Sequence, residues 1–266
     1  METLNNIVLT IQNYMSNYVL IIALLGAGLW FSFRLGFIQV RGFGEGMRRT
    51  FGGLFSKKGE AGADGMSSFQ ALATAIAAQV GTGNIAGAAT ALAIGGPGAI
   101  FWMWIAAFLG MATIYAEAIM AQKYKTVGVD GQVTGGPVYY IRAAFKGTFG
   151  KVLAGIFAIL ITLALGFMGN AVQSNSIAAS FHTAFGIPQW IMGLVVAVIA
   201  IFVFMGGMKR IAKVTETIVP FMAALYIIGS LIVIIYNYKN IPYAFASIFI
   251  GAFSPSSVVG GAAGAT

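Results

Sequence analysis

Residues Gly81 to Gly87, which read Gly-Thr-Gly-Asn-Ile-Ala-Gly, are the segment best suited to bind a small ligand. They interrupt an apolar run, 67–94, that contains no charged residue and is longer than a helix needs to cross a hydrocarbon core of about 30 Å. Each glycine disfavours continuous helix by up to about 1 kcal/mol relative to Ala. A break at membrane depth is tolerated only where protein or water satisfies the freed backbone groups. We therefore expect a broken helix whose free N–H and C=O groups can bind an ion or a zwitterion.

The residue types around this break favour a carboxylate, an ammonium group and a small cation. A helix that restarts at about Asn84 directs its N–H groups and positive end toward a carboxylate. The carbonyls of the preceding half-helix suit Na⁺, and Thr82 and Asn84 add a neutral hydroxyl and amide. The alternative is that Gly83 and Gly87 only let neighbouring helices pack closely. The substrate candidates are Thr82, Gly83 and Asn84, and the ion candidates include Gly81 and Thr82.

A second polar group lies inside a later apolar segment. Asn170, Gln173 and Ser174 occupy positions i, i+3 and i+4, so they share one helix face. Amides inside a membrane span are costly unless they find partners. Asn170 and Gln173 are therefore candidate substrate-binding residues that form a neutral polar wall, and hydrogen bonding between helices for stability is the alternative.

The ionisable residues support neither a metal site nor catalysis. Glu117 lies near the expected cytoplasmic end of an apolar segment beside Lys123, which favours an interfacial role, with ion coupling or gating as the alternative. Glu216 is predicted to form a surface pair with Lys213. His182 is the single histidine and cysteine is absent, so neither a metal centre, a nucleophilic triad nor a cofactor is expected.

The composition indicates an integral membrane protein. Hydrophobic residues make up 59% of the 266-residue chain and charged residues only 8%, against roughly 25% in soluble domains. The first apolar run is interpreted as a retained anchor, because residues 1–16 lack the basic region of a secretory signal. Glycine-rich turns are expected at 95–98 and 135–137, with Pro137 starting a helix. The expected apolar segments are roughly 18–33, 67–94, 100–121, 152–180, 190–205 and 218–236.

The basic residues predict the orientation of these segments. Fourteen of the fifteen Lys and Arg residues fall in alternate loops, and Lys239 is the exception. By the positive-inside rule the N-terminus is then outside and those loops are cytoplasmic, so the net charge of +8 is mainly a topology signal and nucleic-acid binding is not expected. The first of these loops, 34–65, reads as an amphipathic surface helix followed by a polar loop. After Lys239, Ile241-Pro242 is expected to interrupt helix, and the apolar run 243–253 is too short to span.

Several stretches, in order along nearly the whole chain, resemble the alanine or glycine:cation symporter family. None of them would suffice alone. They are Arg34-Leu35-Gly36-Phe37-Ile38-Gln39, Ser68-Phe69-Gln70-Ala71-Leu72, Gly81 to Gly87, Gly95-Gly96-Pro97-Gly98-Ala99-Ile100-Phe101-Trp102-Met103-Trp104, Gly135-Gly136-Pro137, Gly169-Asn170 with Gln173 and Asn175, and Gly206-Gly207 with Lys209 and Ile211.

The resemblance implies Na⁺- or H⁺-coupled uptake of small neutral amino acids, alanine or glycine above all. The lack of a carboxylate in the middle of a span favours Na⁺. It implies an all-α membrane fold of about six transmembrane helices, which comprise one extra N-terminal helix and the first five-helix repeat of an inverted-repeat transporter. The implied division is 1–66 for the extra helix and amphipathic segment, 67–239 for the repeat, and 240–266 for an external segment. Thr82, Gly83, Asn84, Asn170 and Gln173 would face the substrate, in a multi-pass protein of the cell (inner) membrane.

The family has a second repeat that completes the site, and this chain is expected to lack it. We therefore expect the chain to be the N-terminal part of a longer transporter, or a truncated product. A pore or channel subunit without concentrative transport is the alternative function. A membrane-embedded enzyme is disfavoured, because the spans lack a histidine cluster, cysteine or paired acids. The residues do not decide between alanine and glycine, the L and D forms, stoichiometry or oligomeric state.

Overall fold

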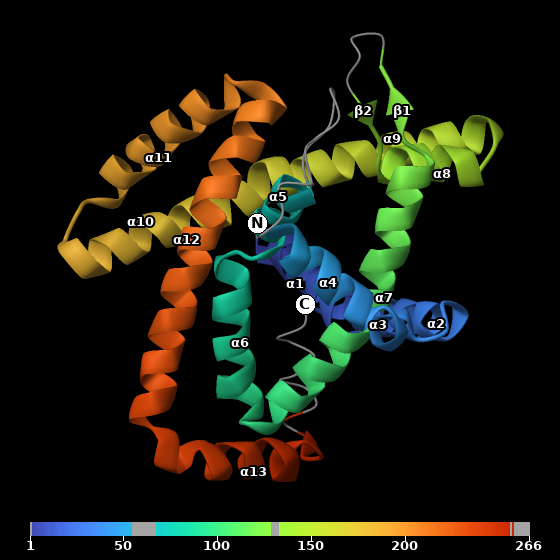
Figure 1. Ribbon diagram of the computed structural model, residues 1–266. Coiled ribbons are helices and arrows are strands. Elements are labelled where there is room, and N and C mark those ends of the chain that lie inside the picture. The colour runs from blue at the N-terminus through green and yellow to red at the C-terminus, as the bar shows by residue number, and fades with distance from the viewer. Residues whose placement is uncertain (1, 55–67, 129–132, 256, 258–266) are drawn as a thin grey trace. The chain divides into compact units, whose positions relative to one another are not determined.

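The computed structural model describes residues 2–54, 68–128, 133–255 and 257, and this part of the chain is nearly all helical (Figure 1). It divides into two compact units, which are described separately. The first comprises Met1–Arg48, Gly83–Ala116 and Leu225–Thr266, and the second comprises Arg49–Thr82 and Glu117–Ala224. The helix break and the amide face of the later segment thus contribute residues to the second unit.

The chain begins with a long helical run that changes its hydrogen-bonding pattern once. Helix α1 (Glu2–Tyr14) passes through a π-helical turn η1 (Met15–Leu20) into α2 (Ile21–Arg34). The helix therefore begins well before the expected apolar segment 18–33, because polar residues near the N-terminus continue the same helix. Short helix α3 (Ile38–Arg41) and α4 (Phe43–Leu54) follow, so the expected surface helix is present, while the polar loop at 59–65 lies outside the described residues.

The predicted break separates α5 (Ser68–Gln79) from α6 (Thr82–Gly95). The expected turn at Gly95–Gly98 is confirmed, because Gly96 takes a left-handed φ of +66° and α7 (Gly98–Lys123) begins directly afterwards. Glycine suits this position because it has no side chain to clash at positive φ.

The described residues that follow α7 are mostly helical and include one pair of short strands. Strands β1 (Thr126–Val127) and β2 (Val133–Thr134) pair antiparallel. Pro137 starts the next helix as predicted, after Gly136 at a φ of +103°. The remaining elements are α8 (Pro137–Ala144), α9 (Gly147–Ile161), the π-helical η2 (Thr162–Gly169), α10 (Asn170–Phe185), α11 (Gln189–Phe204), α12 (Gly207–Tyr236), the 3₁₀ turn η3 (Tyr238–Asn240) and α13 (Ile241–Gly251).

The start of α7 and the end of α13 pack closely within the first unit. The backbones of Gly98 and Gly251 lie so close that a Cβ on Gly98 would collide with Gly251. The indole N–H of Trp102 donates to the carbonyl of Ala252, and the Ser257 hydroxyl donates to Gly95 O at 2.7 Å. Trp102 therefore links the start of α7 to the end of α13. Helix is interrupted before α13, as expected. Pro242, however, lies in the first turn of α13 instead of ending a helix. Proline is tolerated there because the N–H groups of a first turn have no partner within the helix.

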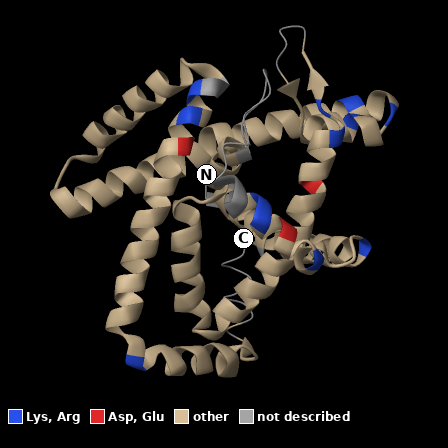
Figure 2. Ribbon diagram, in the orientation of Figure 1, with Lys and Arg blue, Asp and Glu red and all other residues tan. Residues whose placement is uncertain are grey.

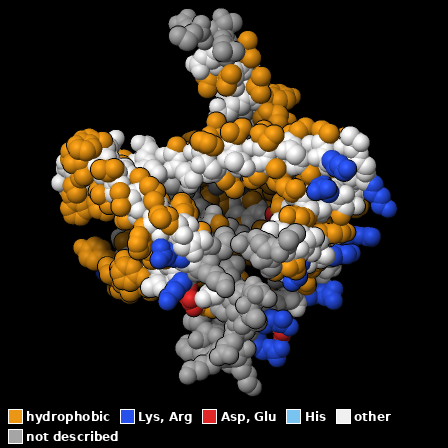
Figure 3. Space-filling model, turned by 90° about the horizontal axis from the view of Figure 1, so that it is seen from above, with side chains coloured by type: hydrophobic (Ala, Val, Ile, Leu, Met, Phe, Trp, Pro, Cys, Tyr) orange, Lys and Arg blue, Asp and Glu red, His pale blue; other side chains and the backbone are white. Residues whose placement is uncertain are grey.

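Within the described residues, four helical runs are long and apolar enough to cross a membrane. They are Asn5–Arg34, Gly98–Lys123, Gly147–Phe185 and Arg210–Tyr236, and Gln189–Phe204 is a shorter apolar helix. Most of their large apolar side chains are exposed, as expected of surfaces covered by lipid. Figure 2 shows long uncharged stretches between Lys and Arg residues near helix ends, and Figure 3 shows hydrophobic side chains spread over the visible helices. The chain therefore forms a multi-pass membrane protein, while the six-helix count and the repeat stay predictions.

Candidate ligand site at the helix break

The break itself is short. Helix α5 closes with a bond from Val80 N–H to Ile76 O of 2.8 Å, and α6 begins at Thr82, so Val80 and Gly81 form the whole interruption. The expected restart at Asn84 is thus wrong by two residues, and Gly83 and Asn84 belong to the first turn of α6. This turn tolerates glycine at a modest cost, because its N–H groups have no partner within the helix.

The side chain of Gln173 lies at the start of α6. Its Oε1 atom accepts the Thr82 hydroxyl at 2.9 Å and the Thr82 backbone N–H at 3.3 Å. Gln173 comes from α10, 91 positions further along the chain. A neutral amide oxygen therefore satisfies the N–H group at a helix N-terminus, which is where an anionic oxygen also binds well.

Gly81 leaves the space that this contact occupies. A Cβ built on Gly81 would collide with the Nε2 atom of Gln173, whereas a Cβ on Gly83 would meet nothing within 4 Å. The close approach of the amide to the break thus requires glycine at position 81 and not at position 83.

Asn170 has a local partner. Its Nδ2 donates to Gly166 O at 2.9 Å, within the π-helical segment η2 that precedes α10. π-Helical turns inside α-helices are frequent at functional sites. The residues of this segment give little sign of it beyond the glycines at 166 and 169, because π-helical hydrogen bonding has no clear residue preference.

The second unit brings together Gly81, Thr82 and Gln173 among the predicted site residues. Asn170 lies on α10 with Gln173, whereas Gly83 and Asn84 fall in the first unit. The pairing of the break with the α10 amide face is thus confirmed for Thr82 and Gln173. The role of these residues in binding a substrate stays a prediction.

The opposite end of α5 carries a second polar contact that the sequence analysis missed. Gln70 Nε2 donates to Glu216 Oε2 at 3.0 Å, and the hydroxyls of Thr74 and Thr215 lie 3.1 Å apart. All four side chains are partly buried between α5 and α12. The predicted Glu216–Lys213 surface pair is therefore replaced by a contact between helices.

Glu117, the remaining ion candidate, lies on α7 in reach of a tyrosine on α8. Burial, and secondly the negative charge of Glu117, raise the pKa of Tyr140 above its usual value of 10.0. This arrangement is compatible with the expected interfacial role of Glu117.

Among the described residues no group of three His, Cys, Asp or Glu side chains could hold a metal ion. The Nδ1 atom of His182 lies 3.1 Å from Ile187 O.

Long uncharged helices and a helix interrupted beside neutral amides define the class: a multi-pass membrane protein with a discontinuous helix. The model of the sodium:alanine symporter family matches residues 1–266, and the chain belongs to that family. This is a family of transporters and not of enzymes.

Curated relatives cover most of the chain. The sodium/alanine symporter AgcS of Methanococcus maripaludis is 42% identical over 257 residues, which are 96% of this chain and 56% of the relative. A Bacillus subtilis protein described as a putative sodium/proton-dependent alanine carrier, YrbD, is 46% identical over 91% of this chain and 48% of its own length. The probable sodium/glutamine symporter GlnT of the same species is 41% identical over 99% of the chain and 54% of its own length. The chain thus spans about half the length of these relatives.

Proposed function

We propose that this chain belongs to a secondary active transporter that couples the uptake of a small neutral amino acid to a cation, with Na⁺ as the favoured ion. The contact between Thr82 and Gln173 at the helix break is the observation that carries the proposal. It lies within a chain of the sodium:alanine symporter family, and the named relatives are sodium/alanine, sodium/proton-dependent alanine and sodium/glutamine carriers.

The break offers complementary groups for a zwitterion. The substrate carboxylate accepts N–H groups in the first turn of α6, from Thr82, Gly83 and Asn84, in place of the Gln173 oxygen. Backbone carbonyls at the end of α5 are the ligand type that suits an ammonium group and Na⁺. Asn170 and Gln173 then present uncharged polar groups, which exclude no neutral amino acid by charge.

Coupling is assigned to the backbone and hydroxyl oxygens at Gly81 and Thr82, because hard cations prefer oxygen ligands. Glu117, at the expected cytoplasmic end of α7, is assigned an interfacial role, with ion coupling or gating as the alternative. The protein operates in the cell (inner) membrane with its N-terminus outside, as the distribution of basic residues favours. No organic cofactor takes part.

Transport by the complete polypeptide that carries this chain tests the proposal. Proteoliposomes should accumulate labelled alanine or glycine above the outside concentration when Na⁺ is supplied outside, and collapse of the Na⁺ gradient should release the label. Parallel assays with glutamine, D-alanine and an inward proton gradient define the substrate and the ion. Folded protein without ion-dependent accumulation of any of these amino acids would contradict the proposal.

A pore or channel subunit is the competing function, since glycine-lined passages also occur in channels. It predicts single-channel conductance and equilibration of amino acid without accumulation. The same proteoliposomes, measured electrically, separate the two functions.

A further inference from the structure

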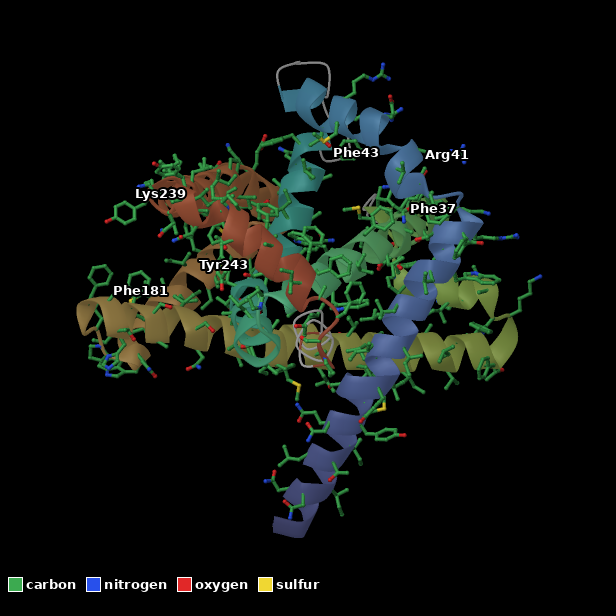
Figure 4. The ribbon with its side chains drawn as sticks, turned by 90° about the horizontal axis from the view of Figure 1, so that it is seen from below. Phe37, Arg41, Phe43, Phe181, Lys239 and Tyr243 are labelled. Carbon is green, nitrogen blue, oxygen red and sulfur yellow. The ribbon has the colours of Figure 1, made fainter. Side chains whose placement is uncertain are left out.

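The segment from Phe37 to Arg48, which we call the basic interfacial segment, begins where the first long apolar helical run ends. That run closes at Arg34, so the residues just beyond it lie at the level of lipid headgroups. Figure 4 shows Phe37, Arg41 and Phe43 close together where α2 gives way to α3 and α4. The apolar helical run that ends at Arg34 therefore places the basic interfacial segment at the membrane surface.

The segment is held at a fixed angle to α2. Gly36 and Phe37 both take left-handed backbone conformations, with φ of +60° and +51°, which is uncommon for a bulky residue such as Phe37. Gln39 Nε2 donates to the buried Ser32 hydroxyl at 2.8 Å and reaches Phe108 O at 3.5 Å. These contacts tie α3 to α2 and α7 within the first unit.

The segment has an apolar face that the described protein leaves open. Val40, Phe43 and Met47 recur at spacings of three and four residues and are 62%, 64% and 42% exposed. Arg41, at the end of α3, and Glu45 and Arg48, on α4, recur at similar spacings and alternate along the sequence with these apolar residues. Exposed apolar side chains next to cations are typical of helices that lie in a membrane interface.

The charged side keeps donors available for an anion. Arg48 contacts Glu45 at 2.6 Å, yet its side chain remains 77% exposed. A guanidinium has five N–H donors in a planar fork that matches phosphate oxygens, so one carboxylate contact does not saturate it. Arg41 is exposed as well.

We propose that the basic interfacial segment is a binding surface for anionic phospholipids, with headgroup phosphates on Arg41 and Arg48. Val40, Phe43 and Met47 enter the boundary between headgroups and acyl chains. The proposal goes beyond the orientation rule, which requires only that positive charge stay on one side of the membrane. Lipid is favoured over a protein partner because the segment starts at the end of a span and combines an open apolar face with exposed arginines.

The test compares variants of the complete polypeptide in nanodiscs of phosphatidylcholine with or without phosphatidylglycerol. The amount of phosphatidylglycerol that stays bound after purification is measured by native mass spectrometry. The double variant Arg41→Gln/Arg48→Gln should lose about tenfold or more of the preference for phosphatidylglycerol, because each basic residue near an anionic surface contributes to binding. Arg41→Lys/Arg48→Lys should retain most of it, and the matched control Lys239→Gln should retain all of it.

An unchanged lipid preference in the double Gln variant would overturn the proposal. A preference that inorganic phosphate abolishes would also overturn it, because the site would then be one for a free anion.

The apolar face is tested separately with Phe43→Trp, whose added fluorescence should be quenched more by brominated phosphatidylglycerol than by brominated phosphatidylcholine. Absence of quenching would show that protein covers this face, and this variant keeps the proposal falsifiable if the Gln variant fails to fold.

Discussion

The two ends of helix α5 carry polar contacts of different kinds. At its start, Gln70 and Thr74 meet Glu216 and Thr215 through partly buried side chains. Beyond its other end, after Gly81, the backbone N–H and hydroxyl of the half-buried Thr82 meet a single amide oxygen from the exposed Gln173. The first contact includes a charged group with little access to water, and the second contact leaves helix-terminal N–H groups within reach of a ligand.

This difference separates stability from binding. Removing a partly buried partner of a carboxylate leaves a polar group without its bond, which lowers the free energy of unfolding. Replacing an exposed amide at a helix N-terminus costs little stability, because water can take its place. We therefore expect variants at the start of α5 to change folding, and variants at the break to change substrate affinity.

The largest effect is expected from Gly81→Val, which introduces a side chain into the position of the Gln173 amide. The added side chain displaces the Gln173 amide from Thr82 and also occupies space at the break, so substrate affinity should fall by about tenfold or more. Isothermal titration with alanine measures the loss. Gly83→Ala is the matched control, because its Cβ meets nothing within 4 Å, and equal losses in both variants would contradict the assigned role of Gly81.

Glu216→Ala should come next and should act on stability. The Gln70 amide loses a charged acceptor at a partly buried site, at a cost of about 1–2 kcal/mol in the free energy of unfolding. Thermal unfolding in detergent, followed by circular dichroism, measures the change. Glu216→Gln keeps an acceptor oxygen and should recover most of the loss. If Glu216→Ala unfolds normally and instead abolishes Na⁺ dependence, the contact is an ion site.

Gln173→Ala should weaken substrate affinity by about 1 kcal/mol, roughly five- to tenfold, with almost no change in unfolding temperature. Asn84→Ala is expected to act in the same direction, since its amide lies in the first turn of α6. Both are measured by titration and by the yield of folded protein. Loss of folded protein with affinity intact would show that these amides are structural.

The smallest effect is expected from Thr74→Val, which removes one of two hydroxyls that contact each other between α5 and α12. The loss should be about 0.5–1 kcal/mol in stability, because Thr215 retains carbonyl acceptors on its own helix, at Ile211 and Ala212. Chemical denaturation measures it, and transport should be unchanged. A larger effect on uptake than on unfolding would show that this end of α5 moves during transport.

The sequence predicted what depends on local spacing. The break between α5 and α6, the turn at Gly96 and the helix start at Pro137 all follow from the conformational preferences of glycine and proline. Thr82 and Gln173 were singled out because polar groups in apolar spans need partners.

Contacts between distant residues were not predictable in the same way. Gln70 and Glu216 are 146 positions apart, and Lys213 was the nearer partner in sequence. The restart at Thr82 was missed because glycines at 83 and 87 suggested a longer interruption, although one helix can contain both. The contact of Trp102 with Ala252, beside the close backbone approach of Gly98 and Gly251, has no local sequence signal either.

The π-helical segment η2 determines which side chains of α10 face the helix break, because it sets the rotation of α10 about the helix axis. Residues Thr162 to Gly169 bond from i to i+5, so each such turn holds one residue more than an α-helical turn. One residue corresponds to about 100° around the helix axis. Conversion of a single π turn to α-helix, without other compensation, would therefore turn Gln173 away from Thr82 by more than a quarter of a revolution. The side chain that reaches the break is thus selected by the hydrogen-bond register of a segment four to eleven positions earlier in the chain.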